Sequence, residues 1–341
     1  MTTPTDSSPL LSVAALTVTF PGAAGPVRAV DTLQFTVDAG ETVCLVGESG
    51  CGKSLTALSL LRLVPPPGSL ATGSRIAFDG RDLLGLDDES LRQIRGQHMA
   101  MIFQEPMTAL NPVLTVGDQI AEVVRVHTKA SRSEAWDRAV RMLQQVGIAD
   151  APTRAKQYPH ELSGGMRQRV MIAMALVLSP KLVIADEPTT ALDVTIQAQI
   201  LELLRDLRAR TGMALLLITH DLGVVAEMAS RVIVMYAGRI VEEAPVGDLF
   251  AAPSHPYTEG LLAAVPRLGE EQERLTTISG SVPPLGQLSS GCAFRDRCAH
   301  AWDRCATEVP PLYPVSPAHR ARCHLVDEPQ RRAAAAHGAT P

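Results

Sequence analysis

The chain has 341 residues, which is too long for one compact domain of ordinary size, so we expect two domains. Apolar residues make up 46% and charged residues 20%, and the net charge is −5, which excludes the strong positive charge of most nucleic-acid-binding proteins. Aromatic residues are only 4%, so few rings could stack on bases. The longest apolar run, VMIAMALVL, is half a membrane span, and no secretory signal begins the chain. We therefore expect a cytoplasmic protein.

Short apolar runs that alternate with helical patterns predict a doubly wound α/β fold. Residues 16–35 alternate apolar and polar side chains around a Pro-Gly turn, which is typical of antiparallel strands. Later runs are continuously apolar, as expected of strands that are buried on both faces. Because helical patterns separate them, we expect a mostly parallel sheet. These five runs are residues 42–46, 99–103, 182–186, 215–219 and 232–236.

Two helices have clear start or stop signals. Ser131 and Glu134 form a capping box in front of apolar residues at helical spacing. A second helical pattern, TIQAQILELLRDLRARTG, places its apolar residues on one side and ends at Gly212.

Changes in composition divide the chain. The helical patterns between the second and third buried runs predict a helical subdomain at about residues 105–180. After Phe250 the sequence becomes rich in Pro, Ser and Gly, which is typical of a linker. We therefore expect one domain over residues 10–250 and a smaller C-terminal unit over residues 251–341.

A glycine-rich loop directly after residues 42–46 matches G-x-x-x-x-G-K-[ST] at every position. Glycines let successive N–H groups face one anion, and the helix that begins here adds its positive end. Lys53 would reach the β- and γ-phosphates of a nucleotide, and the Ser54 hydroxyl would bind Mg²⁺. The residues expected to hold the nucleotide are Gly47, Ser49, Gly50, Cys51, Gly52, Lys53, Ser54 and Leu55.

Polar residues end or directly follow three of the buried runs. Asp186 could support Mg²⁺, and Glu187 beside it could accept a proton from water or orient it. Gln104 could reach both the metal and the water, and His220 could hold the γ-phosphate. In isolation each has an ordinary alternative: a solvated turn for the acids, a strand cap for the glutamine and a surface position for the histidine.

A second anion-binding turn lies in HELSGGMRQRV, where Ser163, Gly164 and Gly165 precede a helix. One γ-phosphate cannot occupy two such turns on one chain. We therefore expect the second turn to serve a nucleotide bound to another subunit.

Taken together, these segments resemble the ATP-binding subunits of ABC transporters over residues 12–250. GESGCGKS is similar to Walker A, MIFQEP to the Q-loop, LSGGM to the signature, LVIADE to Walker B, ALD to the D-loop and TH to the switch histidine. Met166 replaces the usual signature Gln, a form associated with oligopeptide, dipeptide and nickel importers. The resemblance implies a P-loop NTPase (RecA-like) fold with an antiparallel β subdomain, a helical subdomain and a small C-terminal extension.

The resemblance also implies roles for further residues and partners. Phe20 would stack on adenine, and a nucleotide of the partner would be covered by Ser163, Gly164, Gly165, Met166 and Asp193. The cofactors would be ATP and Mg²⁺. The partners would be a second ATPase subunit, homologous or identical, two membrane permease subunits and an extracytoplasmic substrate-binding protein, with no nucleic acid. The chain would then lie at the cytoplasmic face of the cell membrane as a peripheral subunit.

Four cysteines near the C-terminus, Cys292, Cys298, Cys305 and Cys323, suggest a metal site in a reducing compartment. Their region resembles the C-terminal extension of peptide-importer ATPases, some of which carry an iron–sulfur cluster. The spacings are looser than the paired cysteines common at zinc, and few large apolar residues surround them, so we expect a [4Fe–4S] cluster that replaces a core. Zinc is the main rival, and a tail with unliganded thiols is the third reading.

The sequence therefore predicts an ATPase that powers an ABC importer, with di- or oligopeptides as the expected cargo. Import of nickel or another solute is an alternative, and so is a soluble ABC ATPase in DNA repair or translation. The latter would need long heptad repeats or two cassettes in one chain, and the sequence has neither. An iron–sulfur redox protein would need a second substrate site, for which the sequence offers no candidate.

Overall fold

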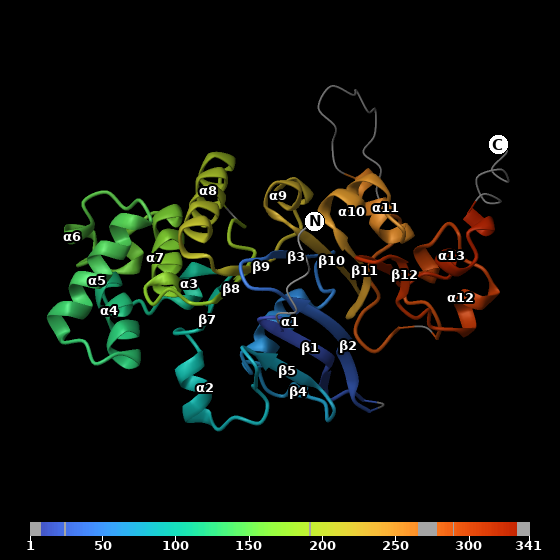
Figure 1. The fold of residues 1–341 in the computed structure, drawn as a ribbon, viewed down its shortest axis with the longest axis horizontal. Coiled ribbons are helices and arrows are strands. Elements are labelled where there is room, and N and C mark those ends of the chain that lie inside the picture. Colours follow the sequence, from blue (N-terminus) through green and yellow to red (C-terminus); the bar gives the residue numbers. More distant parts are fainter. Residues whose placement is uncertain (1–7, 24, 191, 265–277, 289, 333–341) are drawn as a thin grey trace. The chain divides into compact units, whose positions relative to one another are not determined.

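The computed structural model describes residues 8–23, 25–190, 192–264, 278–288 and 290–332, drawn in colour in Figure 1. The chain forms two compact units that interleave in sequence. Among the described residues, the first unit contains residues 8–12, 36–42 and 77–218, and the second contains residues 13–35, 43–76 and those from 219 to 332.

Three parallel strands form the centre of the first unit. They are β7 (Met99–Ile102), β8 (Leu182–Asp186) and β9 (Ala214–Ile218), with β8 paired to both of the others. Every residue of β8 and β9 is buried, which explains why both read as continuous apolar runs. A short hairpin of β5 (Arg75–Phe78) and β6 (Arg81–Asp82) precedes α2 (Asp88–Ile94).

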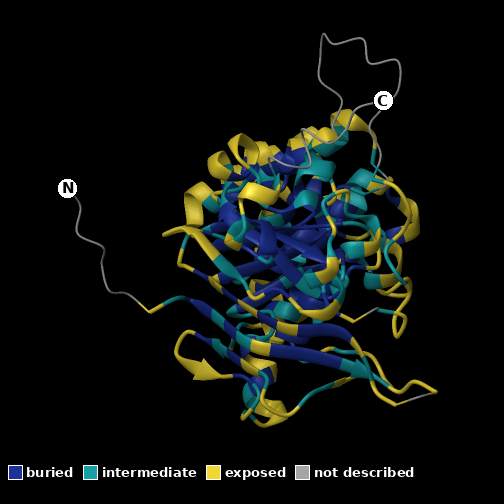
Figure 2. Ribbon diagram, turned by 90° about the vertical axis from the view of Figure 1, so that its right-hand side faces the viewer, coloured by how far each residue is buried: buried dark blue, intermediate teal, exposed yellow. Residues whose placement is uncertain are grey.

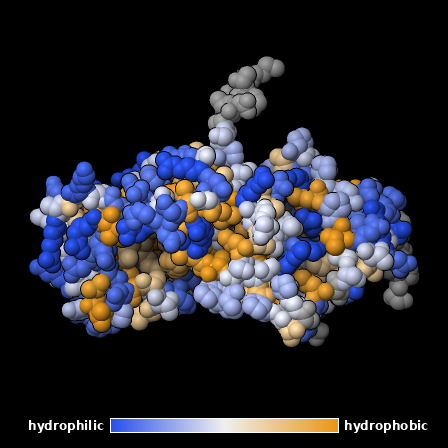
Figure 3. Space-filling model, turned by 90° about the horizontal axis from the view of Figure 1, so that it is seen from below, coloured by the Kyte–Doolittle hydropathy of each residue, from blue (hydrophilic) through white to orange (hydrophobic). Residues whose placement is uncertain are grey.

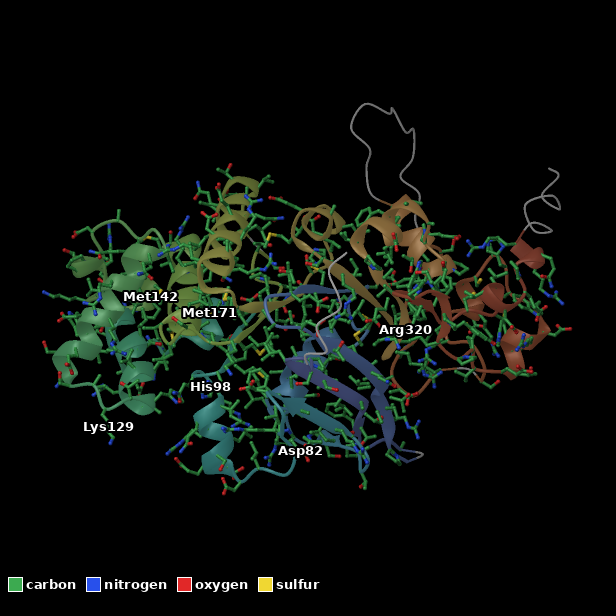
Figure 4. All side chains as sticks on the ribbon, viewed as in Figure 1. Asp82, His98, Lys129, Met142, Met171 and Arg320 are labelled. Atoms are coloured by element: carbon green, nitrogen blue, oxygen red, sulfur yellow. The ribbon has the colours of Figure 1, made fainter. Side chains whose placement is uncertain are left out.

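Helices fill the chain between β7 and β8. The long ones, α4 (Val116–His127), α5 (Arg132–Gln145) and α7 (Gly164–Leu176), contact one another and lie side by side in Figure 1. Met171, labelled in Figure 4, lies on α7 and is buried. The short elements in this part of the chain are α3 (Pro106–Ala109), α6 (Ala151–Arg154) and η1 (Pro159–Glu161). The long helix α8 (Val194–Thr211) follows β8.

In the second unit, β1 (Leu11–Phe20) pairs with β2 (Val27–Val37) and with β4 (Ser69–Leu70). The expected antiparallel strands are therefore present, but β1 begins five residues before the predicted alternation. Ala14 and Ala15 interrupt the pattern, and Ala15 has a φ of 50°, a backbone irregularity that hid the start of the strand.

The other strands of the second unit form a sheet in the order β12-β13-β11-β10-β3. In this sheet β3 (Thr42–Val46) and β10 (Arg231–Tyr236) run parallel, and β11 (Arg239–Pro245) pairs antiparallel with β10. The C-terminal residues add β13 (His319–Ala321) and β12 (Tyr313–Ser316) at the edge, which the sequence did not predict. The helices are α1 (Lys53–Leu60), α9 (Leu222–Met228), α10 (Val246–Ala251), α11 (Pro256–Ala263), η2 (Arg295–Arg297), α12 (Asp303–Thr307) and α13 (His324–Asp327).

Many of the buried residues lie in the strands, which are largely dark blue in Figure 2. On the face drawn in Figure 3, hydrophobic residues form separate patches among hydrophilic ones. Within the described residues, every helix is too short or too polar to cross a membrane.

Candidate nucleotide-binding and catalytic site

The glycine loop between β3 and α1 has a backbone that only glycine can adopt at its two ends. Gly47 and Gly52 have φ values of +151° and +103°. A Cβ atom on Gly47 would lie 2.3 Å from the carbonyl oxygen of Met235, and one on Gly52 would lie 3.0 Å from that of Ala29. The loop therefore curls tightly in the second unit, as a phosphate-binding loop must.

Lys53 is the first residue of α1 and is buried in the curl of the loop. Its ammonium group donates hydrogen bonds to the carbonyl oxygens of Gly47 at 2.8 Å and Glu48 at 3.1 Å. The amides of Lys53, Ser54 and Leu55 belong to the first turn of the helix, where backbone N–H groups have no partner within the helix and favour anions. The loop thus offers a positive charge and backbone donors in the form that suits a polyphosphate.

Phe20 ends β1 beside an open pocket of about 380 Å³. Its ring packs on Gly68, where a Cβ atom would lie 2.7 Å from the ring. Pro21, Gly22 and Pro67 also line the pocket, so an apolar surface with one aromatic ring faces solvent. That surface suits a planar base.

Gln104, Asp186 and Glu187 come together in the first unit. Asp186 is the buried last residue of β8, and Glu187 follows it. The Gln104 amide nitrogen donates to the Glu187 carboxylate at 3.1 Å, and the Thr190 hydroxyl donates to the same oxygen at 2.8 Å. Glu187 has a φ of 45°, and its backbone N–H donates to the carbonyl oxygen of Ile218 on β9. A carboxylate fixed at a strand end in a strained backbone is typical of a catalytic position.

The second anion-binding turn forms the start of α7, also in the first unit. Ser163 caps the helix by accepting a hydrogen bond from the backbone N–H of Met166 at 3.3 Å. A Cβ atom on Gly165 would lie 2.9 Å from the side chain of Ile196 on α8, so glycine is needed where the two helices touch. Asp193 caps α8 by accepting from the Ile196 backbone N–H at 2.9 Å, so the LSGGM and D-loop segments lie together. Ala191 of the D-loop lies outside the described residues.

His220 belongs to the second unit, lies two residues after the end of β9 in sequence and is exposed. Asp221 directly after it caps α9 by accepting from the backbone N–H groups of Gly223 and Val224. The capped helix therefore begins two residues after the histidine.

Comparison with known proteins identifies the family to which these site residues belong. Residues 30–190 match the ABC transporter family, and residues 241–305 match the C-terminal region of oligopeptide/dipeptide transporters. The chain is 53% identical to the oligopeptide transport ATP-binding protein AppD of Bacillus subtilis, covering 89% of this chain and 92% of that protein. It is 49% identical to the dipeptide transport ATP-binding protein DppD of Escherichia coli, covering 92% and 96%. This chain belongs to the ATP-binding subunits of ABC transporters, in the oligopeptide/dipeptide family.

A solved structure supports the fold of this ABC ATPase. A dimeric ATP-binding cassette in a post-hydrolysis state, bound to ADP and Pi, matches with a TM-score of 0.61 and 28% identity, covering 69% of this chain and 98% of that one. The predicted P-loop α/β fold is therefore confirmed. As an ABC ATPase the chain binds ATP and Mg²⁺ and hydrolyses ATP, and its family implies membrane permease partners and a dimeric ATPase.

The oxygen atoms of the predicted metal ligands suit Mg²⁺, which prefers hydroxyl, carboxylate and amide oxygens. Ser54 offers a hydroxyl on α1, Asp186 a carboxylate at the end of β8, and Gln104 a side-chain amide after β7. No softer ligand is among them, so the chemistry of the set fits the ion.

The predicted iron–sulfur cluster is wrong, and the zinc alternative fails with it. Cys292, Cys298, Cys305 and Cys323 line one small cavity. Nevertheless, across the described ranges no three Cys, His, Asp or Glu side chains are grouped as ligands of one metal ion. Burial raises the pKa of the Cys298 thiol to about 11 and that of Cys323 to about 12, so both are protonated at neutral pH. The thiols are free cysteines of the fold.

The described C-terminal residues share a core with β10 and β11. The ring of Phe294 lies 5.2 Å from that of Tyr236 on β10 and 5.4 Å from that of Tyr257 on α11. The strand β13 pairs with β11, where Arg320, labelled in Figure 4, binds the buried Glu243 carboxylate. The missing core that motivated the metal prediction is therefore supplied by β10 and β11.

Sequence reasoning missed two residues that touch the glycine loop. Tyr257 and Arg297 both contact Glu48, although they are more than 200 positions away in the sequence. The number of aromatic residues was one available signal. The chain has only 4 tyrosines and 6 phenylalanines, and Tyr236, Tyr257 and Phe294 pack together beside these contacts.

Proposed function

We propose that this ABC ATPase powers the import of di- or oligopeptides. The observation that carries the proposal is the match of residues 241–305 to the C-terminal region of oligopeptide/dipeptide transporters. The near full-length identity to AppD and DppD, named for oligopeptide and dipeptide transport, supports it. In this proposal residues 10–250 are the ATPase domain, with a helical subdomain at about residues 105–180, and residues 251–341 are the importer-type extension.

Catalysis by this chain is chiefly positioning and electrostatic stabilisation. The amides of the glycine loop and Lys53 bind the β- and γ-phosphates, while Phe20 stacks on adenine. Glu187 accepts a proton from the attacking water, and Gln104 holds that carboxylate in place through its hydrogen bond at 3.1 Å. His220 binds the γ-phosphate. Ser54, Asp186 and Gln104 would hold Mg²⁺, which would supply positive charge against the phosphates.

The second anion-binding turn acts across a subunit boundary in this proposal. Two ATPase subunits, identical or homologous, pair head to tail, so that each loop with its ATP is covered by the partner's second turn. The covering residues are Ser163, Gly164, Gly165, Met166 and Asp193. The pair docks on two permease subunits at the cytoplasmic face of the membrane, and an extracytoplasmic binding protein delivers the peptide.

Reconstitution of the transporter tests the proposal. The chain is purified with its co-expressed permease subunits and binding protein, placed in liposomes, and supplied with labelled dipeptides, oligopeptides or nickel. We expect ATP-dependent uptake of peptide that is lost with Lys53→Ala. ATP-dependent uptake of nickel alone would assign a different cargo, and a chain that never purifies with a permease would contradict a role in transport.

A further inference from the structure

Arg297 belongs to the C-terminal unit (residues 251–341), whose described residues form part of the second compact unit. It binds Glu48 of the glycine loop through a bidentate ion pair. Its guanidinium group donates to the two carboxylate oxygens of Glu48 at 2.6 and 3.0 Å. It also donates to the carbonyl oxygens of Ser279 at 2.8 Å and Ile278 at 3.3 Å. The Arg297 side chain is only 5% exposed, whereas that of Glu48 is 31% exposed. The arginine is thus buried and hydrogen-bonded within the C-terminal unit, and its guanidinium group also contacts the loop.

Tyr257 on α11 makes a second contact with the same loop residue. Its hydroxyl oxygen accepts a hydrogen bond from the Glu48 backbone N–H at 2.8 Å. The Tyr257 side chain is fully buried, and its ring lies 4.8 Å from that of Tyr236. Glu48 is therefore held by its side chain and by its backbone, from two different elements of the C-terminal unit.

The groups that hold Glu48 are themselves fixed. The guanidinium carbon of Arg297 lies 5.7 Å from the centre of the Tyr236 ring and 5.8 Å from that of Phe294. Phe294 in turn packs on Tyr257. One aromatic cluster thus orients both anchors.

Glu48 lies where its position controls the loop. Its carbonyl oxygen accepts hydrogen bonds from the Lys53 ammonium at 3.1 Å and from the Cys51 backbone N–H at 3.3 Å. A shift of Glu48 would therefore move the lysine and the turn that carries Gly50.

We propose that Arg297 and Tyr257 are positioning residues that fix the glycine loop, through Glu48, in the shape that binds ATP. The C-terminal unit is then part of the nucleotide site of this ATPase. This inference rests on the proposed role of the loop in binding the phosphates. It does not depend on the transported cargo.

Mutants of the full-length chain test the inference by ATP titration and steady-state ATPase assays. We expect Arg297→Gln and Glu48→Ala each to raise the Kd and the KM for ATP about 10-fold, with kcat nearly unchanged. The double mutant is expected to be no worse than either single mutant, because both changes remove the same contact. Arg297→Lys restores the charge but not the two-pronged geometry, so its KM is expected to lie between those of wild type and Arg297→Gln.

Arg295→Gln is the matched control. Arg295 lies on the same short helix η2, but its guanidinium group donates to the carbonyl oxygens of Ser290 and Ala306 inside the C-terminal unit. We expect this mutant to keep the wild-type KM for ATP. Thermal melting of each mutant separates loss of folding from loss of loop position.

The inference would be overturned by an unchanged KM in Arg297→Gln, or by equal increases in KM for Arg297→Gln and Arg295→Gln. Additive effects of Arg297→Gln and Glu48→Ala would also contradict it. Lys53→Ala distinguishes this inference from the proposed role of the loop. If Lys53→Ala still binds ATP with wild-type affinity, the proposed role of the loop fails. If Lys53→Ala loses ATP but Arg297→Gln does not, only the positioning inference fails.

Discussion

Glu187 combines a left-handed backbone with a side chain that two neighbours hold. The hydrogen bonds from Gln104 and Thr190 end on the same carboxylate oxygen. Such double donation fixes the direction of the carboxylate, which a general base for water requires. We predict that Glu187→Gln binds ATP with near wild-type affinity but turns over about 10²–10⁴-fold more slowly. Nucleotide titration and ATPase rates, measured on one preparation, check both parts.

Thr190→Val supplies the comparison for this prediction. It removes one hydrogen bond to Glu187 while the carboxylate stays, so a much smaller loss of rate is expected. Turnover near the wild-type rate in Glu187→Gln would remove this residue from the role of base.

At the level of single residues, the sequence predicted identities well and contacts poorly. Gly47, Gly52 and Lys53 could be assigned because the phosphate loop needs those residue types at a fixed spacing. The contact of Arg297 with Glu48 could not, because neither residue belongs to a local pattern and the fold alone brings them together. The positive φ of Glu187 was equally hidden, since it is imposed by the hydrogen bond of its backbone to β9.

At the level of elements, local signals predicted the helices closely. The capping box of Ser131 and Glu134 begins α5, and Gly212 ends α8 with a φ of 70°. Strands β12 and β13 were missed because they contain Pro, Ser, His and Arg, which carry no strand pattern. Pairing with β11 forms them, so their stability is tertiary in origin.

His255, which caps α11, gives this region a dependence on pH. Its Nδ1 atom accepts a hydrogen bond from the Tyr257 backbone N–H at 3.0 Å, and the backbone N–H of His255 donates to the buried carboxylate of Glu242 at 3.0 Å. Burial, with Arg332 and Arg322 nearby, lowers the pKa of the imidazole from 6.5 to about 3. The unfolded chain therefore takes up a proton below pH 6.5 that the folded chain refuses, and stability falls as the pH falls.

We predict that this histidine lowers the free energy of unfolding by about 2 kcal/mol between pH 7.5 and pH 5. His255→Asn keeps an oxygen that can cap the helix but does not titrate. Urea denaturation of both proteins at the two pH values should show that the mutant loses about that much less stability on acidification. An identical loss in both proteins would mean that other groups cause it.

At the level of the whole molecule, the family and fold were predicted correctly, whereas the predicted iron–sulfur cluster of the C-terminal residues was wrong. The order of six motifs is a constraint along the chain, so the sequence contains it in full. The core of the C-terminal residues is not local. Phe294 packs on Tyr236, which lies in a strand of the ATPase sheet, and residues 280–330 considered alone have no such surface. The sequence suggested that an iron–sulfur cluster replaces a missing core, but the rest of the chain provides that core.

The last prediction concerns the pair of subunits. LSGGM and the glycine loop are two anion-binding turns on one chain, so in a head-to-tail pair each site takes one turn from each subunit. One subunit carries Lys53→Ala and the other carries Ser163→Arg, in two copies of this chain or in this chain and its homologous partner. Both lesions then fall in one composite site and the other site stays whole. We expect each mutant to be inactive alone and the mixed pair to regain part of the wild-type ATPase rate.

Doubly tagged purification isolates the mixed pair. The control is a pair with both lesions in one subunit, which damages both sites. Activity of the mixture that equals the sum of the separate mutants would contradict shared sites and leave each chain to act alone.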